Sequence, residues 1–97
     1  MADAQFRFEQ DVRNVGLMKG VYIEIIKTEI KPNHVSSVKI GTSKKGHIKE
    51  DLELDRPLYF NESDDDKWLT SFINDVFIKE NKTYIETETS IYEVNFL

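Results

Sequence analysis

One stretch of this 97-residue chain combines glycines, lysines, hydroxyls and a histidine in a pattern that suits phosphate binding. Backbone amides beside Gly41 and Gly46 could approach a phosphate, and the lysines would neutralise its charge. A P-loop carries Lys and then Ser or Thr after its second glycine, whereas His47 follows Gly46, so the P-loop interpretation fails. The alternatives are a basic loop that touches phosphates and a solvated hairpin connection. In the first, the ligand is a nucleotide, a cyclic nucleotide or another small phosphorylated molecule, and its contacts are Lys39, Thr42, Ser43, Lys44, Lys45 and His47.

A second feature is the acidic run from Glu62 to Asp66. Neighbouring carboxylates rarely converge on one cation, and the spacing of an EF-hand is missing, so we expect a solvated loop and no metal. As a surface, the run resembles the phosphate charge of DNA and could engage a basic partner protein. The residues of this predicted partner surface are Glu62, Asp64, Asp65 and Asp66.

The chain offers little for catalysis. Its two histidines, His34 and His47, each lie near a turn, and neither is spaced from a nucleophile and an orienting acid as in a catalytic triad. There is no cysteine, which excludes disulfides and thiolate metal sites and fits a reducing cytoplasm. We therefore expect a protein that is not an enzyme and that carries no cofactor.

Charge is distributed unevenly along the sequence. Residues 1–49 hold nine Lys or Arg against five Asp or Glu, whereas residues 50–97 hold four against thirteen. If the two halves occupy different faces, the domain is an electrostatic dipole that orients toward a charged partner. The alternative is that strands from both halves interleave and mix the charges. The net charge of −5 opposes nucleic-acid binding.

Length and hydropathy favour one small domain over residues 1–97. No apolar run approaches the roughly 20 residues that span a bilayer, and the first residues do not resemble a secretory signal. We therefore expect no membrane association and a cytoplasmic location. So small a core would gain from association, which makes a homo-oligomer an open alternative.

Short alternating segments between turn signals predict a mainly β fold. Residues 6–9 alternate as a strand, and residues 20–30 form the strongest strand, in which Ile23, Ile25 and Lys27 share one face. The mixed pattern of this strand indicates burial on both faces at its centre or, alternatively, a bulge near Ile25-Ile26. The further expected elements are a returning strand at 35–40, a connection at 41–46, an alternating segment at 47–54, and strands at 57–60, 82–88 and 89–97, with a tight turn at Asn81.

Residues 66–78 are ambiguous. Their apolar residues follow a helical stripe, but many of them are also good strand formers. A resemblance favours the strand. Leu58-Tyr59-Phe60, Trp68–Ile73 and Thr87–Val94 resemble small uncharacterised bacteriophage proteins, in which a Thr-Ser-x-Ile/Val strand precedes a Thr-x-x-Ser-x-Tyr strand. This chain departs from them at Phe72, where proline is common, and at Glu88-Thr89, where asparagine often precedes the serine.

The resemblance implies a strand at 68–78 and action in a phage-infected bacterium, and it brings no activity with it. We then expect the hydroxyls of this region to fix strand pairing in a buried network; they belong to Thr70, Ser71, Thr87, Ser90 and Tyr92.

The sequence thus predicts a small, partly open barrel or a curved antiparallel sheet, with an α+β fold containing a helix at about 66–78 as the alternative. The leading functional hypothesis is a non-catalytic phage-type binding protein that inhibits or sequesters a bacterial host factor. The alternatives are a nucleotide-binding module that uses the basic stretch, and an assembly protein that acts through open strand edges at 6–9 or 89–96.

Overall fold

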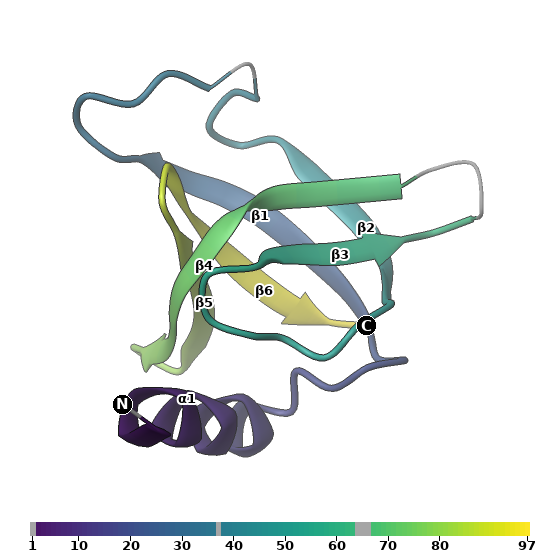
Figure 1. Cartoon of the computed structure of the whole chain (residues 1–97). Coiled ribbons are helices and arrows are strands. Elements are labelled where there is room, and N and C mark those ends of the chain that lie inside the picture. Colours follow the sequence, from purple (N-terminus) through teal and green to yellow (C-terminus); the bar gives the residue numbers. More distant parts are fainter. Residues whose placement is uncertain (1, 37, 64–66) are drawn as a thin grey trace.

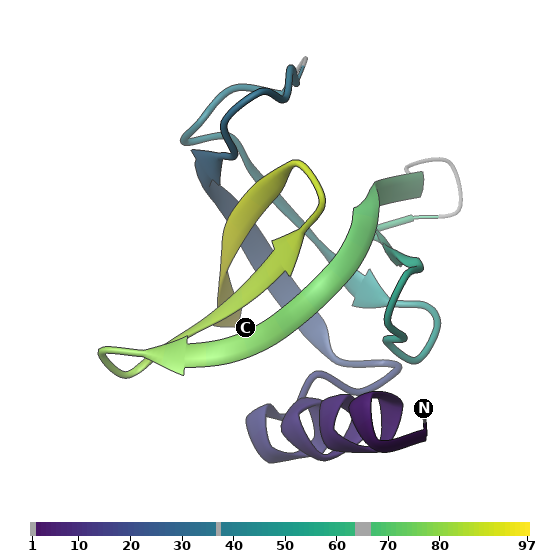
Figure 2. The ribbon, with the colours of Figure 1, turned by 60° about the vertical axis from the view of Figure 1, so that its left-hand side comes forward.

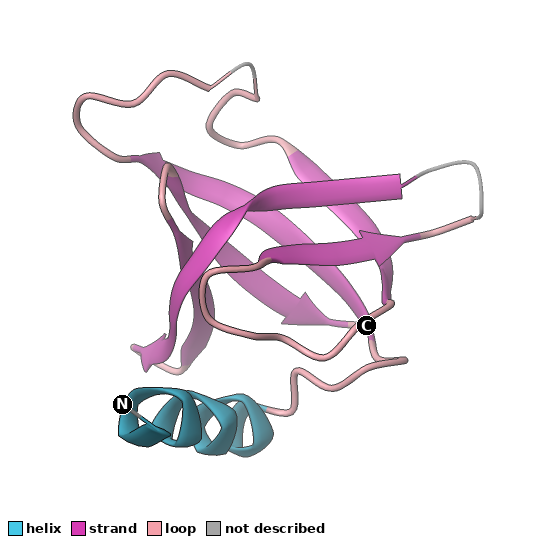
Figure 3. Cartoon of the chain, viewed as in Figure 1, coloured by secondary structure: helices cyan, strands magenta, loops and turns pink. Residues whose placement is uncertain are grey.

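Six antiparallel strands follow one another round a closed barrel in sequence order, and one helix precedes them (Figures 1 and 3). The computed structural model describes residues 2–36, 38–63 and 67–97. Because β1 pairs with both β2 and β6, the barrel closes. The mainly β prediction is confirmed, although the barrel is closed rather than partly open. The elements are α1 (Ala2–Val15), β1 (Tyr22–Ile30), β2 (Ser43–Ile48), β3 (Pro57–Asn61), β4 (Lys67–Lys79), β5 (Lys82–Thr87) and β6 (Ser90–Phe96).

The predicted strand at 6–9 is wrong, because these residues belong to α1. Phe8 and Val12 lie four residues apart on the helix face that joins the core, whereas Phe6 is 62% exposed. The helix ends at Val15, and the positive φ of the following Gly16 lets the Leu17 N–H reach the Val12 carbonyl. The alternation in the sequence predicted that Phe6 and Phe8 share one face of a strand. In the helix these two side chains point in different directions.

Strand β1 confirms the strongest prediction. Ile23, Ile25 and Lys27 share one face as expected; the structure places that face inside the barrel, and Lys27 is as buried as the isoleucines. The bulge lies later than predicted: between Lys27 and Glu29, β1 carries one residue more than β6, and that residue is Thr28.

Strand β2 lies where a connection was predicted. The described residues of the predicted strand at 35–40, namely 35–36 and 38–40, belong to the long β1–β2 loop, and Ser43–Ile48 form the strand itself. Gly46 faces β3 so closely that a Cβ there would lie 2.7 Å from the Asn61 carbonyl carbon. Gly46 therefore allows β2 to pack closely against β3 and does not mark a loop.

Strand β4 settles the ambiguous segment as a strand, and the alternative helix at 66–78 is wrong. Its buried residues Thr70, Ile73 and Val76 are nevertheless three apart. Two register shifts explain this, since β4 carries one extra residue against β3 and another against β5. At each bulge the extra residue shifts the next inward-pointing side chain by one position. The buried residues of β4 therefore recur every three positions, a spacing that resembles that of a helix.

The predicted hydroxyl network is present where β4, β5 and β6 meet. The Ser71 and Thr89 hydroxyls lie 3.0 Å apart, and the Thr89 and Ser90 hydroxyls 3.2 Å apart. Thr87 donates to the Ser90 carbonyl, and the Thr70 hydroxyl accepts from the Leu58 N–H. These bonds fix the β5–β6 turn and the first β4 bulge.

The two ends of the barrel differ. In both ribbon views α1 lies beneath one end, and the long β1–β2 loop extends from the opposite end (Figures 1 and 2). The core runs from Phe8, Val12 and Leu17 at the helix into the barrel interior. Among the described residues, no helix is long and apolar enough to cross a membrane.

Candidate functional site

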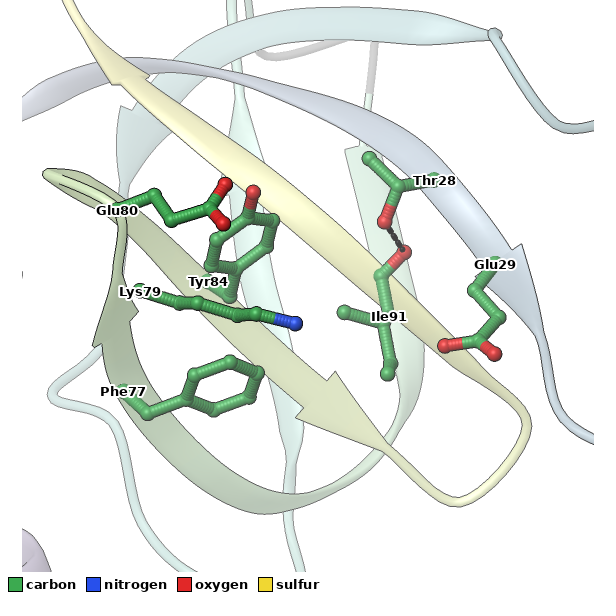
Figure 4. Close-up of a pocket in the computed structure, with 7 residues that line it drawn as sticks. All are labelled: Thr28, Glu29, Phe77, Lys79, Glu80, Tyr84 and Ile91. Carbon is green, nitrogen blue, oxygen red and sulfur yellow. Dashed lines mark hydrogen bonds between the residues drawn. The ribbon is translucent and has the colours of Figure 1, made fainter.

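A groove of about 340 Å³ lies on the outer side of β1, β4, β5 and β6 (Figure 4). It combines aromatic, aliphatic and charged side chains from the consecutive strands β4, β5 and β6, from the β4–β5 turn, and from β1, which is distant in the sequence. Its lining residues are Thr28, Glu29, Phe77, Lys79, Glu80, Tyr84 and Ile91.

The floor of the groove is apolar. Phe77 and Tyr84 are a cross-strand pair of β4 and β5, and their rings stack with centroids 5.3 Å apart and planes 19° apart. Ile91 of β6 extends this floor toward β1 (Figure 4). All three side chains are half-buried, so part of each faces the groove.

The rim is charged. Glu80 lies in the two-residue turn between β4 and β5, where Glu80 and Asn81 both have positive φ, as a type I′ turn requires. Glu29 follows the β1 bulge on the far side of Ile91 (Figure 4). Both carboxylates are exposed, and neither forms an ion pair with a residue that the structure describes. Two other glutamates of this sheet are paired: Glu86 with Lys31, and Glu93 with Lys82.

Lys79 extends along the groove between Phe77 and Tyr84, with its amino group toward Ile91 (Figure 4). The groove therefore already accommodates a basic side chain, its own. An aromatic surface with carboxylates at its ends attracts a cation through the ring quadrupole and through charge-assisted hydrogen bonds.

The predicted phosphate-binding residues do not converge. Because Ser43–Ile48 is a strand, alternate residues point to opposite faces: Ser43, Lys45 and His47 are exposed on the outside, and Lys44 turns inward, with its amino group 5.3 Å from the centre of the Trp68 ring. The β2 backbone is engaged in the ladder with β1. Lys39 and Thr42 lie in the preceding loop, where the Thr42 carbonyl accepts from the Lys27 N–H. The prediction that residues 41–46 form a connecting loop is therefore wrong for Ser43–Gly46, and phosphate binding by these side chains stays a prediction.

The acidic partner surface is described only at Glu62, because residues 64–66 lie outside the described residues. Glu62 is exposed and accepts a hydrogen bond of 3.0 Å from the Tyr22 hydroxyl. This bond, with a small contribution from desolvation and the negative charge of Glu62, raises the pKa of Tyr22. The other face of the Tyr22 ring meets His47, with ring centroids 4.6 Å apart. His34 is exposed in the β1–β2 loop.

Lys27 lies on the same strand face as Ile23 and Ile25, as the sequence predicted, and the structure shows this face to be the inner one. Its side chain is 1% exposed. The ammonium donates to the Ser36 hydroxyl (2.6 Å) and the Val38 carbonyl (3.1 Å), and it lies 5.6 Å from the centre of the Tyr92 ring. Burial lowers the pKa of Lys27 and raises that of Tyr92. Lys27 thereby ties the β1–β2 loop to the barrel.

None of the groove residues was among the predicted site residues. They carry no local signal, because Phe77 and Ile91 are ordinary strand residues until register brings them together. Comparisons with protein-family models, curated proteins and solved structures found no match for this chain. Among the described residues, no group of three or more His, Asp or Glu side chains is placed to hold a metal ion.

Proposed function

We propose that this chain is a non-catalytic binding protein whose groove takes a basic segment of another protein. The observation that carries the proposal is the stacked Phe77–Tyr84 pair with a carboxylate, Glu29 or Glu80, toward each end. In keeping with the resemblance to small phage proteins, the partner would be a bacterial host factor that the protein inhibits or sequesters in the cytoplasm.

The chemistry favours an arginine or lysine side chain over other ligands. Its aliphatic stem matches the apolar floor, its charge matches the rim, and the aromatic rings attract its cationic head. An anionic ligand would face two carboxylates against the single ammonium of Lys79. The net charge of −5 also favours encounter with a basic partner.

A peptide titration tests this function. We would titrate the ¹⁵N-labelled protein with an arginine- and lysine-containing peptide and, as a charge control, with a glutamate-containing one. We expect the basic peptide alone to shift the amides of β4, β5 and β6 around Tyr84. Shifts confined to another face, or equal shifts with the acidic peptide, would contradict the proposal.

Two matched variants locate the site. The groove variant, Tyr84→Ala with Glu80→Gln, removes one ring and one charge, and we expect at least about a tenfold weaker peptide affinity. The control variant, Tyr59→Ala with Glu62→Gln, makes the same changes at strand β3 and just beyond it. It should bind as the wild type does. Equal affinity of all three proteins would remove the groove from the proposal.

The host factor would be sought by crosslinking in bacterial lysate. A specific partner should be captured by wild type and control variant and be lost with the groove variant. A partner that the groove variant captures as well as the wild type does would count against this assignment.

The two alternative functions receive less support from the geometry. Nucleotide binding by the basic stretch lacks a converging set of residues, since β2 divides them between two faces. Assembly through the proposed strand edges lacks the edges: residues 6–9 are helical, and β6 is paired on both sides.

A further inference from the structure

Residues 31–49 are richer in lysine than the rest of the chain; Lys31 is paired with Glu86, and Lys39 is exposed in the β1–β2 loop. Residues 31–49 contain five lysines, two histidines and no Asp or Glu. They form the β1–β2 loop and strand β2, and the loop extends from the barrel end opposite α1 (Figures 1 and 2). The rest of the chain holds all eighteen carboxylates, so it is strongly acidic.

The loop presents apolar side chains beside its charge. Val35 is 95% exposed and Ile40 59% exposed, and Lys39, next to Ile40, is exposed as well. A lone exposed aliphatic residue is ordinary, but two of them flanking a lysine on a basic loop match a site with an apolar floor and a negative rim.

Several hydrogen bonds fix the described residues of this loop, 31–36 and 38–42, against the barrel. Lys27 makes four hydrogen bonds to it: its ammonium to Ser36 and Val38, its N–H to the Thr42 carbonyl, and its carbonyl from the Gly41 N–H. At the start of the loop, the Lys31 N–H donates a hydrogen bond to the Thr89 carbonyl. A loop ordered in advance loses less conformational entropy when it docks.

We propose that the groove also receives the β1–β2 loop of a second copy of this chain, with Lys39 directed to the carboxylates of Glu29 and Glu80 and with Val35 or Ile40 on the Phe77–Tyr84 floor. The inference rests on the proposed function of the groove, for which it names a partner. Loop and groove are different surfaces of one chain, so the contact is head to tail and repeats from copy to copy. A basic host segment would compete with it.

Complementation of two defective variants tests this contact. The loop variant, Val35→Ser with Lys39→Glu, keeps its groove, and the groove variant, Tyr84→Ala with Glu80→Gln, keeps its loop. In sedimentation velocity at low salt, we expect the wild type to form species larger than dimers at concentrations up to about 500 μM, as a weak micromolar contact requires. Each variant alone should be a monomer. Their mixture should stop at a 1:1 dimer, because only one intact contact can form.

Higher salt should shift the wild type toward monomer, since exposed charges contribute to the contact. Circular dichroism of each variant checks that the fold is intact. A strictly monomeric wild type, or variants that associate like the wild type, would overturn the inference. So would a mixture that contains no heterodimer.

Failure of this inference is separable from failure of the proposed function, because the loop variant retains the groove. Basic peptide that binds the loop variant while the wild type stays monomeric overturns self-association and leaves the groove's function in place. Absence of peptide binding to the monomeric loop variant overturns the proposed function itself.

Discussion

At the residue scale, Lys27 is the most unusual side chain of this barrel. It is buried among apolar residues, and its ammonium contacts a hydroxyl, a carbonyl and an aromatic ring. No carboxylate pairs with it among the described residues. A buried cation without a counter-charge has a desolvation cost that hydrogen bonds only partly offset. Lys27 therefore orders the β1–β2 loop at the expense of stability.

The first prediction concerns the pH dependence of stability. Burial lowers the folded-state pKa of Lys27 below its usual 10.5, so the unfolded chain binds more protons between these two values. The contribution of this group to stability is therefore present above pH 10.5 and is lost as the pH falls through that window. We expect Lys27→Met to be more stable than wild type by about 1 kcal/mol at neutral pH, with a difference that shrinks toward alkaline pH. Urea unfolding at several pH values measures it.

The control for this prediction is Lys45→Met, which removes an exposed lysine of β2. It should show no such pH-dependent gain. A Lys27→Met protein that is less stable than wild type by the same amount at every pH would mean that the hydrogen bonds of Lys27 outweigh its desolvation.

At the element scale, α1 illustrates how two periodicities compete. A strand over residues 6–9 would place Phe6 and Phe8 on one face, whereas the helix buries Phe8 and exposes Phe6. We expect Phe8→Ala to destabilise the fold by about 3 kcal/mol and Phe6→Ala by less than about 0.5 kcal/mol, as measured by chemical unfolding. Equal losses from the two substitutions would be incompatible with this helix.

Strand β2 depends on Gly46 for its approach to β3. A Cβ at this position would lie within 3 Å of the Asn61 backbone and of the Phe60 ring, and backbone cannot move aside as a flexible side chain can. We expect Gly46→Ala to cost about 2 kcal/mol in thermal or chemical unfolding. Ser43→Ala, at an exposed position of the same strand, should cost less than about 0.5 kcal/mol. An unaffected Gly46→Ala protein would show that β2 and β3 are further apart.

At the scale of the whole molecule, closure of the barrel decides which surfaces remain for binding. Strand β6 pairs with β1 and with β5, so its backbone offers no open edge. Side chains on the outer faces and the long β1–β2 loop are left as contact surfaces. The groove and the loop are the two surfaces on which we propose that this barrel recognises another molecule.

Closure makes a prediction for hydrogen exchange. Amides of β6, such as Tyr92 and Val94, should exchange with the slowest group in the protein, at least roughly a hundredfold more slowly than those of the β1–β2 loop. Exchange by two-dimensional NMR measures this. Rapid exchange along β6 would indicate an open sheet instead of a closed barrel.

The sequence by itself determined the mainly β class and the positions of β1, β3, β5 and β6. Dense β-branched residues, period-two alternation and turn residues are local signals that act within a few positions. The shared face of Ile23, Ile25 and Lys27 was also predictable in this way, whereas the hydroxyl network of the C-terminal strands was expected from the resemblance. No contact between distant segments is needed to read these features.

Only the tertiary structure decided the helix, the path of β2 and the groove. The bulges of β4 are defined by its pairing with β3 and β5, and they give the buried residues of this strand a helix-like spacing. Phe77, Tyr84 and Ile91 become neighbours through the register of the consecutive strands β4, β5 and β6, and Glu29 joins them because β1 closes onto β6. The register between strands is a property of the closed barrel as a whole. The candidate site depends on this register, because the register decides which side chains lie next to one another.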